Sequence, residues 1–225
     1  CELNVNDAYS TNTIAVDHAI NISNNLDIPL LYISTAGIFD GKQNSYNDWD
    51  QPNPLSIYGK SKYYSEKNIF RLSNKFLILR AGWMMGGGLK KDKKFVNKII
   101  KQILDGKKEI FVVDDKMGTP TYTHDFARNA KLLIENKKYG LFNLVCSGNT
   151  SRYEVAKEIL NILNLDKKIK LSKVKSSYFK KEYFAKRPKS ENLINLKLQL
   201  MSMDIMRDWK ICLKEYLDNN YKSFF

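Results

Sequence analysis

The chain has 225 residues, of which 43% are hydrophobic, and a formal net charge of +13 at pH 7. This length suits one domain, or one domain with a small lobe, and no segment approaches the ~18 uninterrupted apolar residues of a membrane helix. Cys1, Cys146 and Cys212 are far apart, which argues against a zinc site or a disulfide framework and indicates a reducing, cytoplasmic setting. The lysines are spread along the chain outside any nucleic-acid motif. The charge therefore indicates a solvated surface, one that would also suit an anionic cofactor or substrate.

The apolar pattern predicts alternating helices and strands. Strands are predicted where short apolar runs occur, at Leu30–Ile33, Phe76–Leu79, Glu109–Val113 and Leu141–Val145. Helices are predicted over residues 6–25, from the N-cap Ser56 to about Asn74, around residues 95–104, over 123–135, from the Ser151/Glu154 capping box to about Leu163, and near 192–200 and 207–218. Such alternation is typical of a mostly parallel α/β sheet covered on both faces. It loosens after about residue 145, which predicts a smaller, helical C-terminal lobe.

Tyr58-Gly59-Lys60-Ser61-Lys62 is the segment of chemical interest. On a helix, Tyr58 and Lys62 share one face, so an ammonium group could lower the pKa of a phenol that then donates its proton to a carbonyl oxygen. The same spacing recurs at Tyr63/Lys67 and Tyr153/Lys157, so spacing alone does not choose among the three pairs.

The surrounding sequence favours the first pair. The strand that precedes it ends in Ser34-Thr35, which places two hydroxyls at the carboxyl edge of a parallel sheet, where ligands of open α/β sheets bind. Phe39-Asp40-Gly41 and Pro54-Leu55 follow before Tyr58. This succession resembles the active-site segment of extended short-chain dehydrogenases, most closely that of dTDP-4-dehydrorhamnose reductases. The likeness continues through Leu79–Trp83, Asp115–Thr121, Arg187–Leu193 and the helix with Trp209 and Leu213.

The resemblance implies a Rossmann-like doubly wound NAD(P)-binding domain in residues 1–145, interleaved with segments of the substrate lobe, and a mainly substrate-binding lobe in residues 146–225. It implies Tyr58 as the catalytic acid, Lys62 as its tuner and Thr35 as a hydrogen-bonding partner of the reacting oxygen. The other implied contacts are Ser34, Tyr58, Lys62, Arg80, Ala81 and Gly82 for NADPH or NADH, and Trp83, Pro120, Thr121 and Arg187 for a nucleotide-sugar substrate.

The sequence departs from the family pattern in two places. The glycine-rich phosphate turn of such folds is absent, so we expect that the first βα units lie outside this chain and that the chain alone binds a dinucleotide poorly. Ala36-Gly37 also stands where close relatives have Asp-Tyr, which leaves the identity of the sugar open.

Alternative interpretations remain at this stage. Thr35 could be a strand-end cap, Trp83 core packing, Arg187 a surface cation, and Asn12 either a buried helical amide or part of a proton relay. The leading hypothesis is a reductase of a 4-keto-6-deoxy sugar in polysaccharide precursor synthesis, with no metal, nucleic acid or membrane partner and with a homodimer left open. A nucleotide-sugar epimerase or dehydratase, and a non-catalytic subunit like that of methionine adenosyltransferase, are the competing readings.

Overall fold

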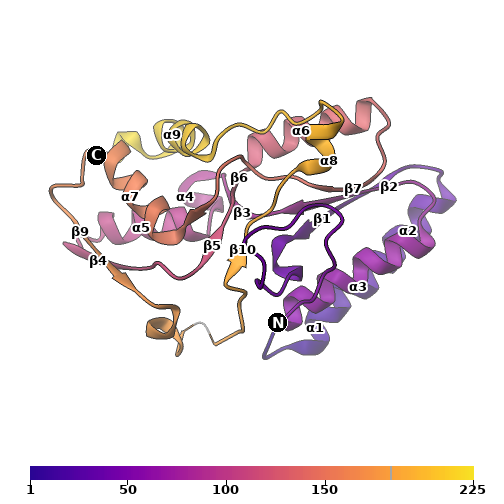
Figure 1. Ribbon diagram of the computed structural model, residues 1–225, viewed down its shortest axis with the longest axis horizontal. Helices are drawn as coiled ribbons and strands as arrows, with labels where there is room; N and C mark the ends of the chain where they lie inside the picture. The colour runs from indigo at the N-terminus through magenta and orange to yellow at the C-terminus, as the bar shows by residue number, and fades with distance from the viewer. Residues whose placement is uncertain (183) are drawn as a thin grey trace.

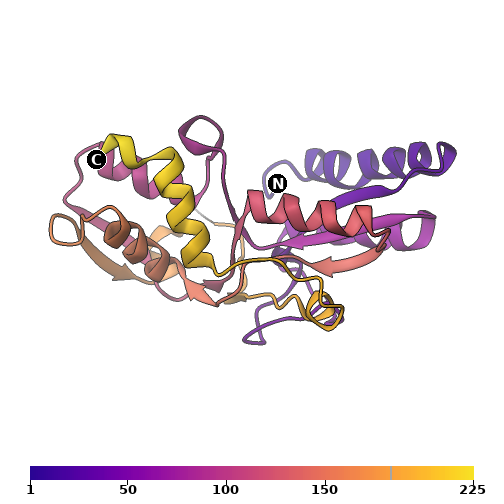
Figure 2. The same cartoon turned by 90° about the horizontal axis from the view of Figure 1, so that it is seen from above.

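Two groups of elements lie along the long axis of the computed structural model, which describes residues 1–182 and 184–225 (Figure 1; Figure 2). The N-terminal helices and the largest sheet lie at one end, and the C-terminal helix lies at the other. Short strands occupy the middle of the molecule, between the two ends. The site described below is built at this junction.

A three-stranded parallel sheet has the order β1–β2–β7. The strands are β1 (Leu30–Thr35), β2 (Phe76–Ala81) and β7 (Gly140–Asn143). The register pairs Thr35 with Ala81 and Arg80 with Asn143, so the carboxyl ends of the strands share one edge of the sheet. Three of the predicted apolar runs form these strands, although β7 ends two residues before Val145. The predicted mostly parallel α/β fold is confirmed.

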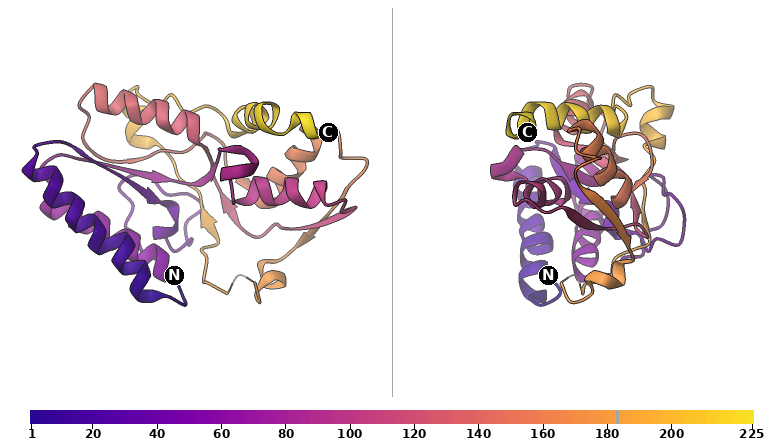
Figure 3. Two further views of the ribbon diagram at one scale, coloured as in Figure 1. Left: turned by 180° about the vertical axis from the view of Figure 1, so that it is seen from behind. Right: turned by 90° about the vertical axis from the view of Figure 1, so that its left-hand side faces the viewer.

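Helices cover both faces of this sheet (Figure 3). The packed helices are α2 (Ala15–Asn25) and α3 (Ile57–Leu72) on one face and α6 (Thr123–Glu135) on the other. Period-two alternation directs Tyr32 and Ile78 into the α2/α3 side, whereas Leu77 and Leu79 join the core that includes Phe126 of α6. The Ser56 hydroxyl accepts the Gly59 N–H at 3.1 Å, which confirms the predicted N-cap of α3.

The predicted N-terminal helix over residues 6–25 is present, with one π-helical turn in its middle. α1 (Val5–Tyr9) leads through η1 (Ser10–Ile14) into α2. Asn12 lies in this π turn and its Nδ2 donates to Ser61 Oγ of α3 at 3.0 Å. The turn therefore bonds the N-terminal helix to the one that carries Tyr58.

The lobe at the other end is mixed α/β. Its elements are α4 (Gly88–Lys91), α5 (Phe95–Leu104), β4 (Glu109–Val113), α7 (Arg152–Ile162), β9 (Lys170–Val174) and α9 (Trp209–Asn220), with the 3-10 turns η3 (Ser176–Phe179) and η4 (Lys222–Phe224). β4 and β9 pair in parallel over their whole lengths. The expectation of a helical lobe is wrong here, because β9 is a strand that has no apolar run: Ser172 and Lys173 separate Leu171 from Val174. The helix expected near 192–200 is also shorter, at α8 (Leu196–Leu200).

Short strands join the two ends of the molecule. They are β3 (Trp83–Met85) and β6 (Pro120–Tyr122) in one parallel pair, and β5 (Met117–Gly118), β8 (Thr150–Ser151) and β10 (Ser190–Glu191) in a small mixed sheet. Each has two or three residues, too few for a periodic signal, and none was predicted. β3, β5 and β10 lie close together in the middle of the molecule (Figure 1), where Trp83 contacts Gly118 and Glu191.

A buried carboxylate ties α6 to α9. Asp125 receives bonds from Arg207 Nε and Nη2 at 2.9 and 2.8 Å, and from Cys212 Sγ at 3.2 Å. Burial acts to raise the pKa of Asp125, but the Arg207 and Cys212 hydrogen bonds outweigh it and lower that pKa to about 2. Cys146 lies beside Cys212, and their hydrogen bond is the largest cause of the raised pKa of the Cys212 thiol. Two cysteines that are distant in sequence are therefore neighbours in the core, and both are free thiols.

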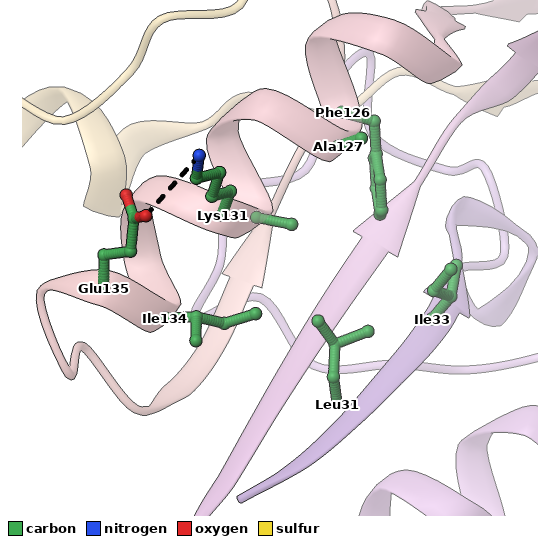
Figure 4. Close-up of a pocket in the computed structure, with 8 residues that line it drawn as sticks. Leu31, Ile33, Phe126, Ala127, Lys131, Ile134 and Glu135 are labelled. Atoms are coloured by element: carbon green, nitrogen blue, oxygen red, sulfur yellow. Dashed lines mark ion pairs between the residues drawn. The ribbon is translucent and has the colours of Figure 1, made fainter.

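An apolar groove lies between β1 and α6 (Figure 4). Leu31 and Ile33 of β1 face Phe126 and Ile134 of α6 across it, and Ile33 is 45% exposed. β1 is the edge strand of the main sheet, so these side chains have a neighbouring strand on one side alone. Over residues 1–182 and 184–225, no helix has the length and apolar character needed to cross a membrane.

Candidate active site

Thr35 marks the carboxyl end of β1, where η2 (Ala36–Ile38) begins. Its Oγ1 accepts the Gly37 N–H at 3.1 Å. The hydroxyl proton is thereby left for another acceptor, and the Thr35 side chain is near enough to Tyr58 to act on its pKa. The strand-end cap and the predicted active-site hydroxyl are thus one group with two contacts.

Tyr58 reaches Thr35 because α3 approaches η2 very closely at the next residue. A Cβ added to Gly59 would lie 2.4 Å from the Gly37 carbonyl oxygen and 3.0 Å from Pro54 Cβ. Only a residue without a side chain permits this approach, which is the physical reason for glycine directly after Tyr58. The Tyr58 side chain remains 42% exposed, so an incoming ligand can reach it.

The pKa of Tyr58 is raised rather than lowered. Burial is the largest cause, the hydrogen bond from Thr35 acts in the opposite direction, and the negative charge of Glu191 adds to the rise. The expectation that Lys62 lowers this pKa is therefore wrong for this geometry. The phenol keeps its proton at neutral pH, the state that a general acid requires.

Lys62 sits one turn along α3 from Tyr58, half-buried beside β1. Its Nζ lies 4.0 Å from the centroid of the Tyr32 ring, a cation–π contact. Burial lowers the pKa of Lys62 to about 8, although the Glu66 carboxylate acts to raise it. Within the described residues, no salt bridge or side-chain hydrogen bond engages this ammonium group, so its N–H donors remain for a ligand.

Ser34 contributes a second unengaged polar atom. Its side chain is 3% exposed, and its Oγ has no hydrogen-bond partner among the residues that the structure describes. A buried hydroxyl without a partner is costly, and a ligand at the strand end would satisfy it. Ser34 and Lys62 are therefore the two groups here best suited to bind a polar molecule.

Arg80 does not belong to this group of open donors. Its Nε and Nη2 bind the Glu66 carboxylate at 3.0 and 2.8 Å, and its Nη1 binds the Asp48 carbonyl at 3.3 Å. Both members of the ion pair are buried, so the guanidinium holds α3 on β2. The interpretation of Arg80 as a cofactor-binding side chain is not what this geometry favours.

The segment after β2 is shaped by the backbone. Gly82 donates its N–H to Thr121 Oγ1 at 3.1 Å, and a Cβ on Gly82 would lie 2.2 Å from the Thr119 carbonyl oxygen. Thr121 has no exposed surface, and Pro120 and Ala81 are also buried. We therefore assign to Pro120 and Thr121 the role of holding the strand that presents Trp83, in place of the predicted direct substrate contact.

Trp83 is half-buried and flanked by three groups. A Cβ on Gly118 would lie 2.2 Å from the Trp83 ring, so the ring rests directly on that backbone. The indole Nε1 donates to Glu191 Oε2 at 2.7 Å. The Arg152 guanidinium lies 3.7 Å from the centroid of the same ring. Trp83 is thus a rigid, partly open aromatic surface rather than plain core packing.

Arg187 is exposed and close to Arg152. Burial is the largest cause that lowers the pKa of Arg152 to about 10; Glu191 acts to raise it, and the positive charge of Arg187 lowers it further. Two guanidinium groups near one another form a site that favours an anion such as a diphosphate. The predicted role of Arg187 as a substrate contact fits this placement.

Residues 1–222 match the family model described as the RmlD substrate binding domain. The chain belongs to this family. A spore coat polysaccharide biosynthesis protein of Bacillus subtilis, SpsK, is 31% identical over 219 residues, which cover 96% of this chain and 74% of that relative. The crystal structure of a dTDP-4-dehydrorhamnose reductase of Clostridium acetobutylicum has a TM-score of 0.90 and 34% identity, covering 97% of this chain and 75% of that one. A Bacillus anthracis dTDP-4-dehydrorhamnose reductase, solved in complex with NADP, has a TM-score of 0.90 and 30% identity over 97% of this chain and 75% of its own.

The choice among the three Tyr/Lys pairs of this RmlD-family chain now rests on position. Lys67 lies 5.7 Å from the Tyr63 ring centroid on the outer part of α3, and Tyr153 instead receives Lys173 at 4.6 Å. Of the three tyrosines, Tyr58 is the one on which a strand-end hydroxyl, that of Thr35, acts. The structure thus favours the pair that its sequence context predicted.

Sequence reasoning missed Glu191 and Arg152 in this RmlD-family site. The segment Arg187–Leu193 resembles the family's Arg-Pro-x-x-Ser-x-Leu element, and Glu191 stands at its serine position; Arg152 is the first residue of α7. A glutamate at the serine position is a signal that sequence reasoning overlooked, whereas the place of Arg152 depends on α7 being brought to Trp83 by tertiary contacts. The described residues also contain no cluster of three or more His, Cys, Asp and Glu side chains that could hold a metal ion.

Proposed function

We propose that this protein reduces the 4-keto group of a dTDP-linked 6-deoxysugar with NADPH or NADH, in the synthesis of polysaccharide precursors in the cytoplasm. The observation that carries the proposal is the group formed by Thr35, Tyr58 and Lys62 at the carboxyl edge of a parallel sheet. It occurs in a chain that is 34% identical to a dTDP-4-dehydrorhamnose reductase over nearly its whole length.

The residues present suit the nicotinamide ribose of such a cofactor. The buried Ser34 hydroxyl has no partner among the described residues, and the Lys62 ammonium group is engaged only with the face of Tyr32. Ribose hydroxyls and an amide would supply hydrogen-bond partners for both groups. Reduced nicotinamide, when bound, supplies the hydride for carbonyl reduction.

Tyr58 and Thr35 perform the proton chemistry in this proposal. On substrate binding, the Thr35 hydroxyl, whose oxygen accepts the Gly37 N–H, would turn its one proton from Tyr58 to the carbonyl oxygen that the Tyr58 phenol also bonds. Tyr58 gives its proton to that oxygen as the carbonyl becomes an alcohol, and the phenolate then regains a proton from solvent. The Lys62 ammonium is not among the groups that shift the pKa of Tyr58, so its role in this proposal is to offer its N–H donors to the ribose hydroxyls.

The nucleotide sugar would extend from Tyr58 toward the two arginines. Trp83 offers an aromatic face beside the sugar position, and Arg152 and Arg187 offer positive charge to the diphosphate. This direction places the neutral end of the substrate at Tyr58 and its anionic part at the guanidinium groups.

The test is a turnover measurement on the full-length protein with dTDP-4-keto-6-deoxyhexose, following the absorbance of NADPH or NADH. We expect oxidation of the cofactor, and a loss of about 10²-fold to 10⁴-fold in Tyr58→Phe, in the range of general acid catalysis. Lys60→Met, an exposed change on the same helix, is the control. No oxidation by folded, cofactor-loaded protein would reject the reductase; nicotinamide released only on denaturation would then favour an epimerase or dehydratase.

A further inference from the structure

Glu191 is a half-buried carboxylate with one oxygen engaged and one oxygen open. Oε2 accepts the Trp83 Nε1–H at 2.7 Å. Oε1 lies beside Gly37, since a Cβ built on that glycine would be 3.7 Å from it. Among the described residues, Glu191 makes no ion pair within 4.0 Å, and the side chain that hydrogen-bonds to it is that of Trp83. The carboxylate is therefore oriented by the protein without a direct ion pair.

The position of this carboxylate is set by three segments. Glu191 stands opposite Gly118 in the pairing of β10 with β5, and Gly118 is the residue on which the Trp83 ring rests. Gly37 has no side chain that would compete for the same space, and it directly follows Thr35-Ala36. An ordinary surface glutamate has none of these constraints. The fold thus directs one carboxylate oxygen toward the carboxyl end of β1.

Electrostatic neighbours place Glu191 between the two ends of the site. Its charge raises the pKa of Tyr58 on one side and acts to raise that of Arg152 on the other. Arg187 affects Arg152, whereas neither arginine is among the groups that shift Tyr58. The contacts agree: Oε1 lies beside Gly37, two residues after Thr35, and Oε2 holds the Trp83 ring on which the Arg152 guanidinium stacks.

The chemistry of a carboxylate selects what it can bind at this point. A keto oxygen and a diphosphate are hydrogen-bond acceptors, and a negative charge repels the second, so neither suits Glu191. A sugar hydroxyl is a donor, and its bond to an ionised acceptor is among the stronger hydrogen bonds. Resting on the proposed function, we propose that Glu191 is a specificity-determining residue that binds a ring hydroxyl of the nucleotide sugar, with Trp83 positioning its carboxylate.

The test compares ligands with and without the sugar. Binding of dTDP-rhamnose and of dTDP to the full-length protein would be measured by calorimetry, for the wild type, Glu191→Ala, Glu191→Gln and the surface control Glu135→Gln. We expect Glu191→Ala to weaken dTDP-rhamnose about tenfold to a hundredfold, the size expected for a hydrogen bond to a charged group, and to leave dTDP unchanged. Glu191→Gln, which keeps an acceptor oxygen, should lose less, and Glu135→Gln should bind as the wild type does.

Two results would overturn the inference. Unchanged affinity of Glu191→Ala for dTDP-rhamnose would show that no hydroxyl is bound there. Equal losses for dTDP and dTDP-rhamnose, reproduced by Trp83→Phe, would show that Glu191 merely holds the indole ring. The inference and the proposed function can fail separately. Even if the protein has no reductase turnover, calorimetry would show whether the extra affinity that the sugar gives dTDP-rhamnose over dTDP depends on Glu191.

Discussion

Burial of Lys62 imposes an energetic cost on the candidate active site. The folded protein lowers the pKa of this lysine from its ordinary 10.5 to about 8, mainly by desolvation. Below pH 8 the lysine is charged in both the folded and the unfolded chain, so folding bears the full cost of burying the charge. Between about pH 8 and 10.5 the folded state releases its proton first, and the contribution of Lys62 to the free energy of unfolding rises with pH.

Lys62→Met should therefore be more stable and inactive. We expect its free energy of unfolding at pH 7 to exceed that of the wild type by about 1–2 kcal/mol, a value discounted for solvent screening. The gain should shrink as pH rises above 8 and vanish above about 10.5. Urea unfolding at pH 7 and pH 10 measures this, with Lys60→Met as the exposed control. A Lys62→Met protein that is less stable by the same amount at both pH values would contradict the assignment.

At the scale of single residues, the sequence predicted which residues belong to the site better than it predicted how their side chains are oriented. Tyr58 and Thr35 could be foreseen because a motif fixes one and the end of an apolar run fixes the other. The sequence did not predict the contact of Lys62 with Tyr32, the raised pKa of Tyr58 or the place of Glu191 in the site. Each depends on the approach of a segment distant in sequence, and no local pattern encodes that distance.

Close contact between α3 and η2 is the feature at the scale of elements that assembles the site. Gly59 lies against the Gly37 carbonyl, and this contact sets the separation of Tyr58 from Thr35. The apolar runs predicted β1, β2 and β4 well, because buried parallel strands read as continuous hydrophobic stretches. The strands of two or three residues that carry Trp83 and Glu191 were not predictable, since pairing with remote segments is what makes them strands.

Gly59→Ala should disrupt the close contact between α3 and η2. The new Cβ would lie 2.4 Å from a backbone oxygen, so α3 must move away from η2. We expect kcat/KM to fall about tenfold to a hundredfold as Tyr58 leaves Thr35, and stability to fall by about 1–3 kcal/mol despite the better helix propensity of alanine. Steady-state kinetics and urea unfolding measure both quantities. Gly37→Ala, whose Cβ would have ordinary contacts of 3.4–3.8 Å, is the matched control for stability. Wild-type kinetics in Gly59→Ala would contradict this role.

The whole molecule places the site at the junction between a parallel sheet and a mixed lobe (Figure 1). Segments on both sides of residue 145 build that lobe, because β4 pairs with β9 and α5 lies against α7. The predicted domain boundary at residue 145 was drawn where strands and helices stop alternating regularly. It therefore describes the sheet better than the lobe. The net charge of +13 also belongs to this scale, since it comes from lysines spread over many elements.

A spread positive charge should act on the encounter with an anionic substrate rather than on the chemical step. Fields of this kind raise association rates and are screened by salt, with a Debye length of about 10 Å at 0.1 M. We expect kcat/KM for a dTDP-linked sugar to fall about threefold to tenfold between roughly 0.05 and 0.5 M KCl, while kcat changes less than about twofold. Steady-state kinetics at constant pH measures this, with sucrose as the uncharged control. A kcat/KM that does not depend on salt would mean that the lysines are too dispersed to steer the substrate, leaving Arg152 and Arg187 as the cations that matter.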